Sequence, residues 1–351
     1  MLTSIGFTNF TVFSRASFEF SPGLNVIIGE NGSGKTHVLK LAYSIISVSS
    51  KGKKEGGIAN PTKAYLQTAV ANKLNNVFKP DELGRLARRD RPGRTRCSVN
   101  CTFLPVKHNV DFSFNTSSKS EVTIEKTPLA WIDKPPVYFP TRELLTIYPG
   151  FVSLYETTHL PFEETWRDTC VLLGAPLARG PREKRIKELL EPLETIMGGK
   201  VELDDSGRFY LNIAGVRMEM HLVAEGLRKL AMIARLIATG SLVDKGYLFW
   251  DEPESNLNPK IIKIIALIIL HLCKSGIQVF IASHSLFLIR ELDIRLREQE
   301  FREIPARFFG LQRKAEGVDI RQGSTVDDIG EIDALQEELS QSDRYLEMEP
   351  H

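Results

Sequence analysis

The sequence predicts an α/β protein that combines a mixed or parallel core sheet with an antiparallel β lobe and a helical lobe. Strands and helices alternate over the last third of the chain, as they do where crossover helices join parallel strands. The short apolar run at 24–28 is followed by a glycine-rich loop and by a helix that begins at Lys35. Several segments between these regions alternate polar and apolar residues, which is typical of antiparallel strands.

The first elements surround the glycine-rich loop. Two alternating strands are expected within 3–20, and the continuous apolar run at 24–28 indicates a buried strand. Apolar residues at helical spacing predict a helix from Lys35 to about Ser47, and a mixed segment continues from there to about residue 96. Further strands are predicted at 97–106, 110–114, 121–125 and 135–140.

The second half of the chain is predicted to be richer in helix. Residues 160–198 are expected to be helical, since Pro181 stands early in an amphipathic stretch and glycines follow its end. Hairpin strands are expected between 201 and 222. Beyond them we expect helices at 224–239, 259–273 and 286–297, strands at 246–250 and 277–282, and two last strands near 306–311 and 317–321.

The composition is that of an ordinary globular chain. Its 351 residues are 42% hydrophobic and carry 45 basic and 44 acidic side chains, which excludes wholesale disorder, collagen-like repeats and a polytopic membrane protein. Four cysteines do not make a disulfide framework, and no signal peptide or bilayer-spanning run is readable. We therefore expect a cytoplasmic protein with no membrane partner.

The charge is unevenly distributed along the chain. Residues 51–96 hold 12 basic and 4 acidic side chains, whereas 324–351 hold 1 arginine and 9 acidic side chains. These runs are either a solvated loop and a solvated tail, or a basic surface for DNA and an acidic tail that docks on a partner or on the protein itself. The arginines of the basic run that a DNA contact would use are Arg85, Arg88, Arg89, Arg91 and Arg94.

The strongest motif is GENGSGKT at 29–36, which fits the phosphate-loop pattern and lies between a predicted strand and a predicted helix. Its glycines allow backbone N–H groups to surround an anion, and the helix N-terminus adds a favourable dipole. We expect Lys35 to contact the β- and γ-phosphates of ATP and the Thr36 hydroxyl to bind Mg²⁺. The expected nucleotide-binding residues here are Gly29, Asn31, Gly32, Ser33, Gly34, Lys35, Thr36 and His37.

Two further strands end in polar side chains of catalytic type. Asp251 and Glu252 end the apolar strand at 246–250, and His284 follows the strand at 277–282. Phosphoryl transfer needs a metal clamp and a positioned water. We therefore assign Asp251 with Thr36 to the metal, Glu252 to the attacking water, and His284 to the γ-phosphate, so that the catalytic set is Glu252, His284 and Lys35.

Together, these motifs resemble the ABC-type ATPases of the RecF/SMC group. The likeness is carried by the opening residues 5–36, by AEGLRKL at 224–230 as the signature motif, by LFWDEPESNLNP at 248–259 as Walker B and D-loop, and by IASHS at 281–285. Within that group the chain is most similar to compact ATPases related to the ATPase domain of OLD-family nucleases and to ATPase components of bacterial anti-phage defence systems. The implied fold is an ABC-type P-loop ATPase.

The resemblance also implies an assembly. In this superfamily two nucleotide-binding domains sandwich two ATP molecules, so a homodimer or higher homo-oligomer is expected. Ala224, Glu225 and Gly226 would then face the partner's γ-phosphate beside a helix N-terminus. Ala224 replaces the serine usual in the family, and the lost hydroxyl is worth about 1 kcal/mol per site. No glutamine stands where the Q-loop is expected, and Thr141, Arg142 and Glu143 are the candidates.

The expected division of the chain is an ATPase core at 1–50 and 220–312, an inserted antiparallel and helical region at 51–219, and a C-terminal strand and acidic tail at 313–351. Cys97, Cys101 and His108 are expected to pack in the core rather than bind metal. Only 61 residues follow residue 290, so no built-in nuclease domain is expected.

The expected function is ATP hydrolysis, to ADP and phosphate, that gates a DNA- or protein-partner activity in DNA maintenance or anti-phage defence. If the anti-phage likeness holds, an effector or nuclease encoded nearby is the expected partner. The alternative is the nucleotide-binding subunit of an ABC transporter; the many strands in the roughly 190 residues between Thr36 and Ala224 favour the RecF-like class. A P-loop kinase or GTPase is less well supported, because no NKxD motif is visible.

Overall fold

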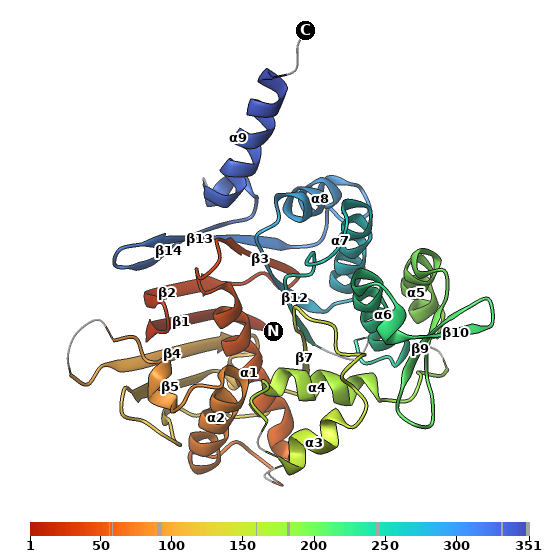
Figure 1. Cartoon of the computed structure of the whole chain (residues 1–351). Coiled ribbons are helices and arrows are strands. Elements are labelled where there is room, and N and C mark those ends of the chain that lie inside the picture. The colour runs from red at the N-terminus through yellow and green to blue at the C-terminus, as the bar shows by residue number, and fades with distance from the viewer. Residues whose placement is uncertain are drawn as a thin grey trace.

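The computed structural model describes residues 1–55, 57, 59–89, 93–158, 160–180, 183–242, 246–330 and 333–348 (Figure 1). Three sheets organise these residues, and nine helices are assigned among them. The predicted combination of a parallel core sheet, an antiparallel β lobe and a helical lobe is confirmed.

The largest sheet has six strands in the order β14–β13–β3–β12–β11–β7. They are β3 (Leu24–Gly29), β7 (Pro136–Phe139), β11 (Tyr247–Asp251), β12 (Gln278–Ser283), β13 (Ala306–Lys314) and β14 (Gly317–Gly323). All neighbouring pairs are parallel except β13 and β14. The carboxyl ends of β3, β12 and β11 therefore meet at one edge, where α/β proteins commonly bind their ligands.

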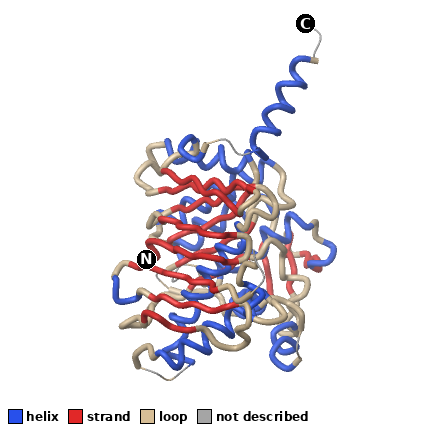
Figure 2. Tube along the Cα trace, turned by 90° about the vertical axis from the view of Figure 1, so that its left-hand side faces the viewer, coloured by secondary structure: helices blue, strands red, loops and turns tan. Residues whose placement is uncertain are grey.

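A five-stranded antiparallel sheet has the order β2–β1–β4–β5–β6. Its strands are β1 (Leu2–Phe10), β2 (Phe13–Glu19), β4 (Arg96–Phe103), β5 (Val110–Asn115) and β6 (Thr123–Lys126). A third, small sheet consists of β8 (Lys200–Leu203), β9 (Phe209–Ile213) and β10 (Val216–Glu219). Figure 2 shows the strands of the two larger sheets stacked along the body of the molecule.

Helices lie on both faces of the parallel sheet. They are α1 (Lys35–Glu55), α2 (Lys63–Phe78), α3 (Phe151–Thr157), α4 (Glu164–Leu173), α5 (Glu183–Met197), α6 (Glu225–Ala238), α7 (Pro259–Lys274), α8 (Leu286–Arg297) and α9 (Asp333–Glu347). Helix α1 lies on one face of the sheet and α7 on the other. In Figure 1, α9 extends away from the rest of the chain. No helix within the described ranges has the length and apolar character needed to cross a bilayer.

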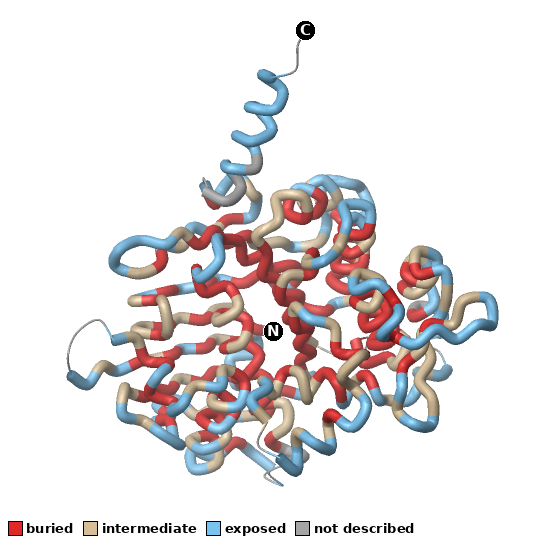
Figure 3. Tube along the Cα trace, in the orientation of Figure 1, coloured by how far each residue is buried: buried red, intermediate tan, exposed pale blue. Residues whose placement is uncertain are grey.

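Successive side chains of the central parallel strands point alternately into two hydrophobic cores, one on each face of the sheet. Ile27 and Phe280 point into a core shared with α1, α2 and the antiparallel sheet. Val26 and Ile281 point into a core shared with α5, α6, α7 and α8. Both faces of each central strand are thus buried, as Figure 3 shows, which explains their continuous apolar sequences.

Several elements differ from their sequence-based bounds. The helix expected to end near Ser47 continues to Glu55, where Gly52 lies against the Trp131 ring with no room for a Cβ. The mixed basic segment contains α2, capped by the Thr62 hydroxyl. The interval 160–198, expected to be helical, holds the two helices α4 and α5. Residues 220–222 form a 3-10 turn rather than strand, and the acidic tail contains a helix.

The strands cross the expected division of the chain. β1 pairs with β4 in one sheet, and β7 joins β11 in the other, so the region 51–219 contributes to both. The expected boundary between 312 and 313 falls inside β13. Cys97 and Cys101 are fully buried in β4, as core residues, and His108 is buried with its Nδ1 3.0 Å from the Ala130 carbonyl.

Candidate nucleotide site

The glycine-rich loop joins the end of β3 to the start of α1. Gly34 has φ +94°, and a Cβ there would lie 2.5 Å from the Phe13 ring, so only glycine fits. The Lys35 side chain is buried inside the loop and its Nζ donates hydrogen bonds to the carbonyls of Gly29, at 2.7 Å, and Glu30, at 3.0 Å. Burial lowers the pKa of Lys35, although nearby Glu252 and Asp251 oppose the shift.

Thr36, which follows β3, lies close to Asp251 at the end of β11, although β12 stands between these two strands in the sheet. The Thr36 hydroxyl lies 3.1 and 3.0 Å from the two carboxylate oxygens of Asp251. Burial, with a further contribution from the charge of Glu252, raises the pKa of Asp251 to about 6, although the Thr36 hydrogen bond opposes this. A buried carboxylate beside a hydroxyl is a set of hard oxygen donors that fits Mg²⁺.

Glu252 and His284 lie at the ends of neighbouring strands. The Glu252 N–H donates to the Ala282 carbonyl at 2.9 Å, and its φ of +46° places it in the left-handed region. A Glu252 carboxylate oxygen lies 3.3 Å from His284 Nδ1. This contact lowers the pKa of Glu252 and raises the pKa of His284, so each favours the charged form of the other.

Glu254 holds the backbone that carries His284. It is buried, and its carboxylate accepts hydrogen bonds from the Ser283 hydroxyl at 2.7 Å and from the His284 N–H at 3.3 Å. The sequence analysis did not assign a role to Glu254. The only sequence feature that pointed to Glu254 was its acidic side chain two positions after Glu252. The structure shows that this side chain reaches the end of the neighbouring strand β12.

The signature segment lies at the start of α6. Ala224 is the N-cap residue and makes no side-chain capping bond, in keeping with the lost hydroxyl. The Glu225 carboxylate accepts a hydrogen bond from Asn256 at 2.9 Å, and a Cβ on Gly226 would lie 2.8 Å from the Asn256 carbonyl. Within the described ranges, these contacts of the signature segment are thus with the 252–258 loop, which joins β11 to α7, and not with the glycine-rich loop.

Two basic residues of α6 were missed by the sequence analysis. Lys229 is 2% exposed and its Nζ donates to the carbonyl of Glu252 at 2.7 Å and to the hydroxyl of Ser255 at 2.6 Å. Arg228 pairs with Glu143 at 2.8 Å. A lysine within the apolar stripe of a predicted helix was a visible signal, but its partner could not be read from the sequence.

The surroundings of the other expected nucleotide-site residues vary. The His37 ring lies near Phe78, with Nδ1 3.0 Å from the Thr11 hydroxyl, and burial lowers its pKa to about 4. Of the Q-loop candidates, Glu143 turns toward α6, Arg142 is exposed, and the Thr141 carbonyl lies 3.4 Å from the Ser255 hydroxyl. Asn31 and Gly32 are exposed at the apex of the loop.

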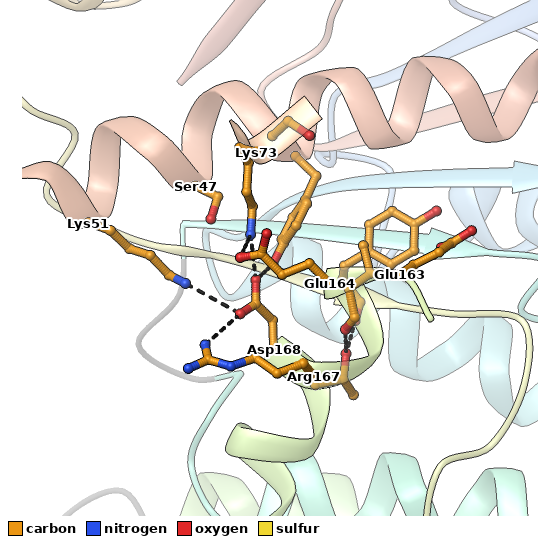
Figure 4. Close-up of polar contacts among 12 residues, drawn as sticks. Ser47, Lys51, Lys73, Glu163, Glu164, Arg167 and Asp168 are labelled. Carbon is orange, nitrogen blue, oxygen red and sulfur yellow. Dashed lines mark hydrogen bonds and ion pairs between the residues drawn. The ribbon is translucent and has the colours of Figure 1, made fainter. Parts of the chain in front are cut away.

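The basic segment is partly neutralised by acidic side chains from elsewhere. Lys73 pairs with Glu164 at 2.8 Å and with Asp168 at 2.7 Å, and Lys51 also reaches Asp168 (Figure 4). Arg96 pairs with Glu125. The exposed arginines are Arg85, Arg89 and Arg94, Arg88 is half-buried with a hydrogen bond to the Val12 carbonyl, and Arg91 lies outside the described residues.

Comparison with known proteins adds a family and a fold. Residues 24–290 match the family described as "AAA domain, putative AbiEii toxin, Type IV TA system". Among solved structures, the chain is similar to an Smc head bound to the C-terminal winged-helix domain of ScpA, with 12% identity and a TM-score of 0.55 over 93% of this chain and 98% of that one. No curated protein matches the sequence.

A second structural relative is an Smc head domain with an extended coiled coil, bound to the C-terminal domain of ScpA derived from Pyrococcus furiosus. It shares 10% identity and a TM-score of 0.51, over 99% of this chain and 98% of that one. At these identities the similarity concerns the fold, which is that of the ABC-type P-loop ATPases of the SMC group.

Proposed function

The chain belongs to this family of AAA domains, and from that premise we propose that it binds and hydrolyses ATP at the ends of β3, β11 and β12. The observation that carries the proposal is the convergence of Lys35, Thr36, Asp251, Glu252 and His284 at one sheet edge. Three strands supply the phosphate-binding loop, the metal ligands and the acid–base pair that phosphoryl transfer requires.

Each residue has a role that its surroundings support. Lys35 and the backbone N–H groups of 32–36 bind the phosphates, and Thr36 with Asp251 would hold Mg²⁺. The metal would supply charge neutralisation on the phosphate oxygens. Glu252 accepts a proton as water attacks the γ-phosphorus, a new P–O bond forms, and the bond to ADP breaks. His284 keeps Glu252 ionised and in place, since their contact lowers the pKa of Glu252.

We further propose that ATP is bound between two copies of the chain. Within the described ranges, the side-chain hydrogen bond of Glu225 and the close approach of Gly226 are both to Asn256 and not to the glycine-rich loop of the same subunit. Ala224 and Glu225 are exposed and Gly226 is half-buried at the N-terminus of α6, a position suited to a phosphate that a second subunit presents. ATP binding would close the dimer and hydrolysis would reopen it.

The coupled activity is proposed to concern DNA or a protein effector, in DNA maintenance or in anti-phage defence. The family description refers to toxin–antitoxin systems, and the SMC heads bind ScpA, which is consistent with a protein partner. The exposed arginines Arg85, Arg89 and Arg94 are the DNA-facing candidates. Neutralising them should lower DNA affinity and its salt slope by about one unit per lost phosphate contact; an unchanged slope would remove DNA from the proposal.

The ATPase proposal is tested with two variants. Lys35→Ala should abolish binding of a fluorescent ATP analogue, because the loop loses its cation. Glu252→Gln should bind ATP normally but hydrolyse it at least a hundredfold more slowly, and should accumulate as an ATP-bound dimer in size-exclusion chromatography with light scattering. Unchanged turnover in Glu252→Gln would remove Glu252 from the water-activating role.

A further inference from the structure

We propose that Lys229 is a positioning residue that ties helix α6 to the backbone of Glu252, so that ATP bound by the partner subunit controls hydrolysis at this subunit's own site. This inference rests on the proposed ATP sandwich. It adds a residue and a direction of control: α6 serves the partner's ATP, whereas Glu252 serves the ATP of its own subunit.

The contacts of Lys229 are concentrated on one short segment. Its Nζ donates to the Glu252 carbonyl at 2.7 Å, to the Ser255 hydroxyl at 2.6 Å and to the Ser255 carbonyl at 3.2 Å. An ammonium group has three protons, and all three are used on residues 252–255. Lys229 therefore holds both ends of the turn that carries the catalytic carboxylate.

A second contact connects the same two elements nearer the start of the helix. Asn256 donates to the Glu225 carboxylate at 2.9 Å, and Gly226 lies against the Asn256 backbone. The first turn of α6 and the 252–258 loop are thus joined at Glu225 and again at Lys229, one helical turn later. A displacement of α6 cannot leave the loop unmoved.

The loop that Lys229 holds is conformationally strained. Glu252 and Asn256 both have positive φ, at +46° and +61°. A glutamate in the left-handed region persists only where surrounding contacts hold it. Without the Lys229 ammonium, the Glu252 carbonyl keeps only the hydrogen bond from the Ser255 N–H, at 3.1 Å. The backbone can then relax, which would move the carboxylate from its position 3.3 Å from His284.

Coupling between the two sites follows from this arrangement. When the partner's ATP binds the N-terminus of α6, the helix is fixed, and through Lys229 the 252–255 turn is fixed with it. Hydrolysis in one subunit then depends on occupancy of the other, and such coupling appears as positive cooperativity in ATP. Lys229 touches neither nucleotide in this scheme, and its effect is exerted through Glu252.

The test compares Lys229→Met with Lys73→Met, which removes another buried lysine that pairs with Glu164 and Asp168 of α4 and makes no hydrogen bond to residues 252–255. ATP turnover of the full-length protein is measured across ATP concentrations. The wild type should show a Hill coefficient of about 1.5 to 2. Lys229→Met should show a Hill coefficient near about 1 and roughly tenfold lower kcat, with affinity for a non-hydrolysable ATP analogue changed by less than about twofold. Lys229→Arg, which keeps a donor, should restore part of the cooperativity.

A purely structural role for Lys229 would have a different signature. It would lower thermal stability or the active fraction at every ATP concentration and leave the Hill coefficient unchanged, which is the expectation for Lys73→Met. If Lys229→Met does not fold, Ser255→Ala takes its place, since it removes one acceptor of the same ammonium. Wild-type cooperativity and kcat in the folded variant would overturn the inference.

The wild type itself separates the two proposals. Turnover that depends on Lys35 but is hyperbolic in ATP would overturn the coupling through Lys229 and leave the ATPase proposal standing. Absence of ATP hydrolysis in the wild type, with no difference between it and Lys35→Ala, would instead overturn the proposed function on which the coupling rests.

Discussion

Two buried lysines, Lys73 and Lys229, differ in the groups that accept their hydrogen bonds: carboxylates at Lys73, and neutral carbonyl and hydroxyl oxygens at Lys229. Lys73 lies between α2 and α4 and forms ion pairs with Glu164 and Asp168 (Figure 4). Lys229 has no carboxylate within ion-pairing distance in the described ranges, and it donates to two carbonyls and a hydroxyl. Burial tends to lower the pKa of both amines. At Lys73 the carboxylates more than offset burial and its pKa is raised, whereas the pKa of Lys229 falls to about 8.

This difference in partners indicates a structural role for Lys73 and a positioning role for Lys229. The Lys73 cluster is internally compensated and fastens α1 to α4, because Asp168 also accepts from Lys51 at 3.3 Å and from the Tyr43 hydroxyl at 2.5 Å. The carboxylates of Glu254, Glu252 and Asp251 form no ion pair with Lys229, and their charges only partly oppose the lowering of its pKa by burial. We infer that its uncompensated position is retained for what it holds rather than for stability.

The largest effect on stability is expected at the centre of the compensated cluster. Asp168→Ala leaves Lys73 and Lys51 without their shared carboxylate, and removing one partner of a buried ion pair costs about 3 to 5 kcal/mol. The loss is measured as the free energy of unfolding in urea. A cost below about 1 kcal/mol would show that the cluster is not compensated in the way described.

Exchanging each lysine for methionine should separate stability from turnover. In the part of the chain that the structure describes, Lys73→Met leaves the half-buried Glu164 without its cation and Asp168 with only Lys51 and Arg167, and should destabilise the fold by about 2 to 4 kcal/mol. Lys229→Met loses hydrogen bonds but also removes an uncompensated buried charge, so a smaller cost of about 1 kcal/mol is expected. Chemical denaturation of both variants measures this. An equal loss of stability in the two variants would show that the ion pairs of Lys73 do not stabilise the fold more than the neutral contacts of Lys229 do.

The two lysines should also respond to pH with opposite sign. Between pH 8 and 10.5 the folded state has already released the Lys229 proton and the unfolded state has not, so the stability of the wild type relative to Lys229→Met should rise with pH. The pKa of Lys73 is raised on folding, so its stabilising contribution is full below pH 10.5 and is lost above it. Denaturation of the wild type and both variants from pH 7.5 to about 11.5 measures both slopes, the rise for Lys229 below pH 10.5 and the loss for Lys73 above it. A falling difference for Lys229 would contradict its lowered pKa.

The smallest effect is expected at an exposed pair of the same basic segment. Arg96 and Glu125 pair on the surface of the antiparallel sheet, with both side chains well exposed. Exposed pairs contribute about 0 to 1 kcal/mol, and salt screens them. Arg96→Ala should therefore leave the urea midpoint almost unchanged, and its small effect should disappear in 0.5 M salt. A cost similar to that of Asp168→Ala would mean that burial is not what distinguishes the cluster.

The sequence predicted the parts of the site whose information is local. The glycine spacing of 29–36 and the acids after an apolar strand have meanings that do not depend on distant residues, and the alternation of strands and helices predicted the parallel sheet that brings them together. The distribution of charge was less readable. Lys51, Lys73 and Arg96 counted toward a basic segment, yet their carboxylate partners come from 125–168.

The Lys229 contacts could not be predicted for a related reason. They require that α6 pack against the loop after β11, and no periodicity in either segment specifies that pairing. Helix α2 was missed because its apolar residues, at 66, 70, 74 and 77, are embedded in a basic and asparagine-rich context. The acidic helix α9 was missed because charge count alone does not distinguish a helix from a solvated tail.

The left-handed backbone of Glu252 has a consequence for any attempt to make this protein more robust. Glycine adopts such a conformation without steric penalty, so replacing Glu252 with glycine should relieve backbone strain of about 1 kcal/mol while removing the carboxylate. A library selected only for heat resistance would therefore enrich an inactive protein at this position. Thermostability screens on this chain need a turnover readout, because the substitution that best relieves backbone strain falls on the residue proposed to activate water.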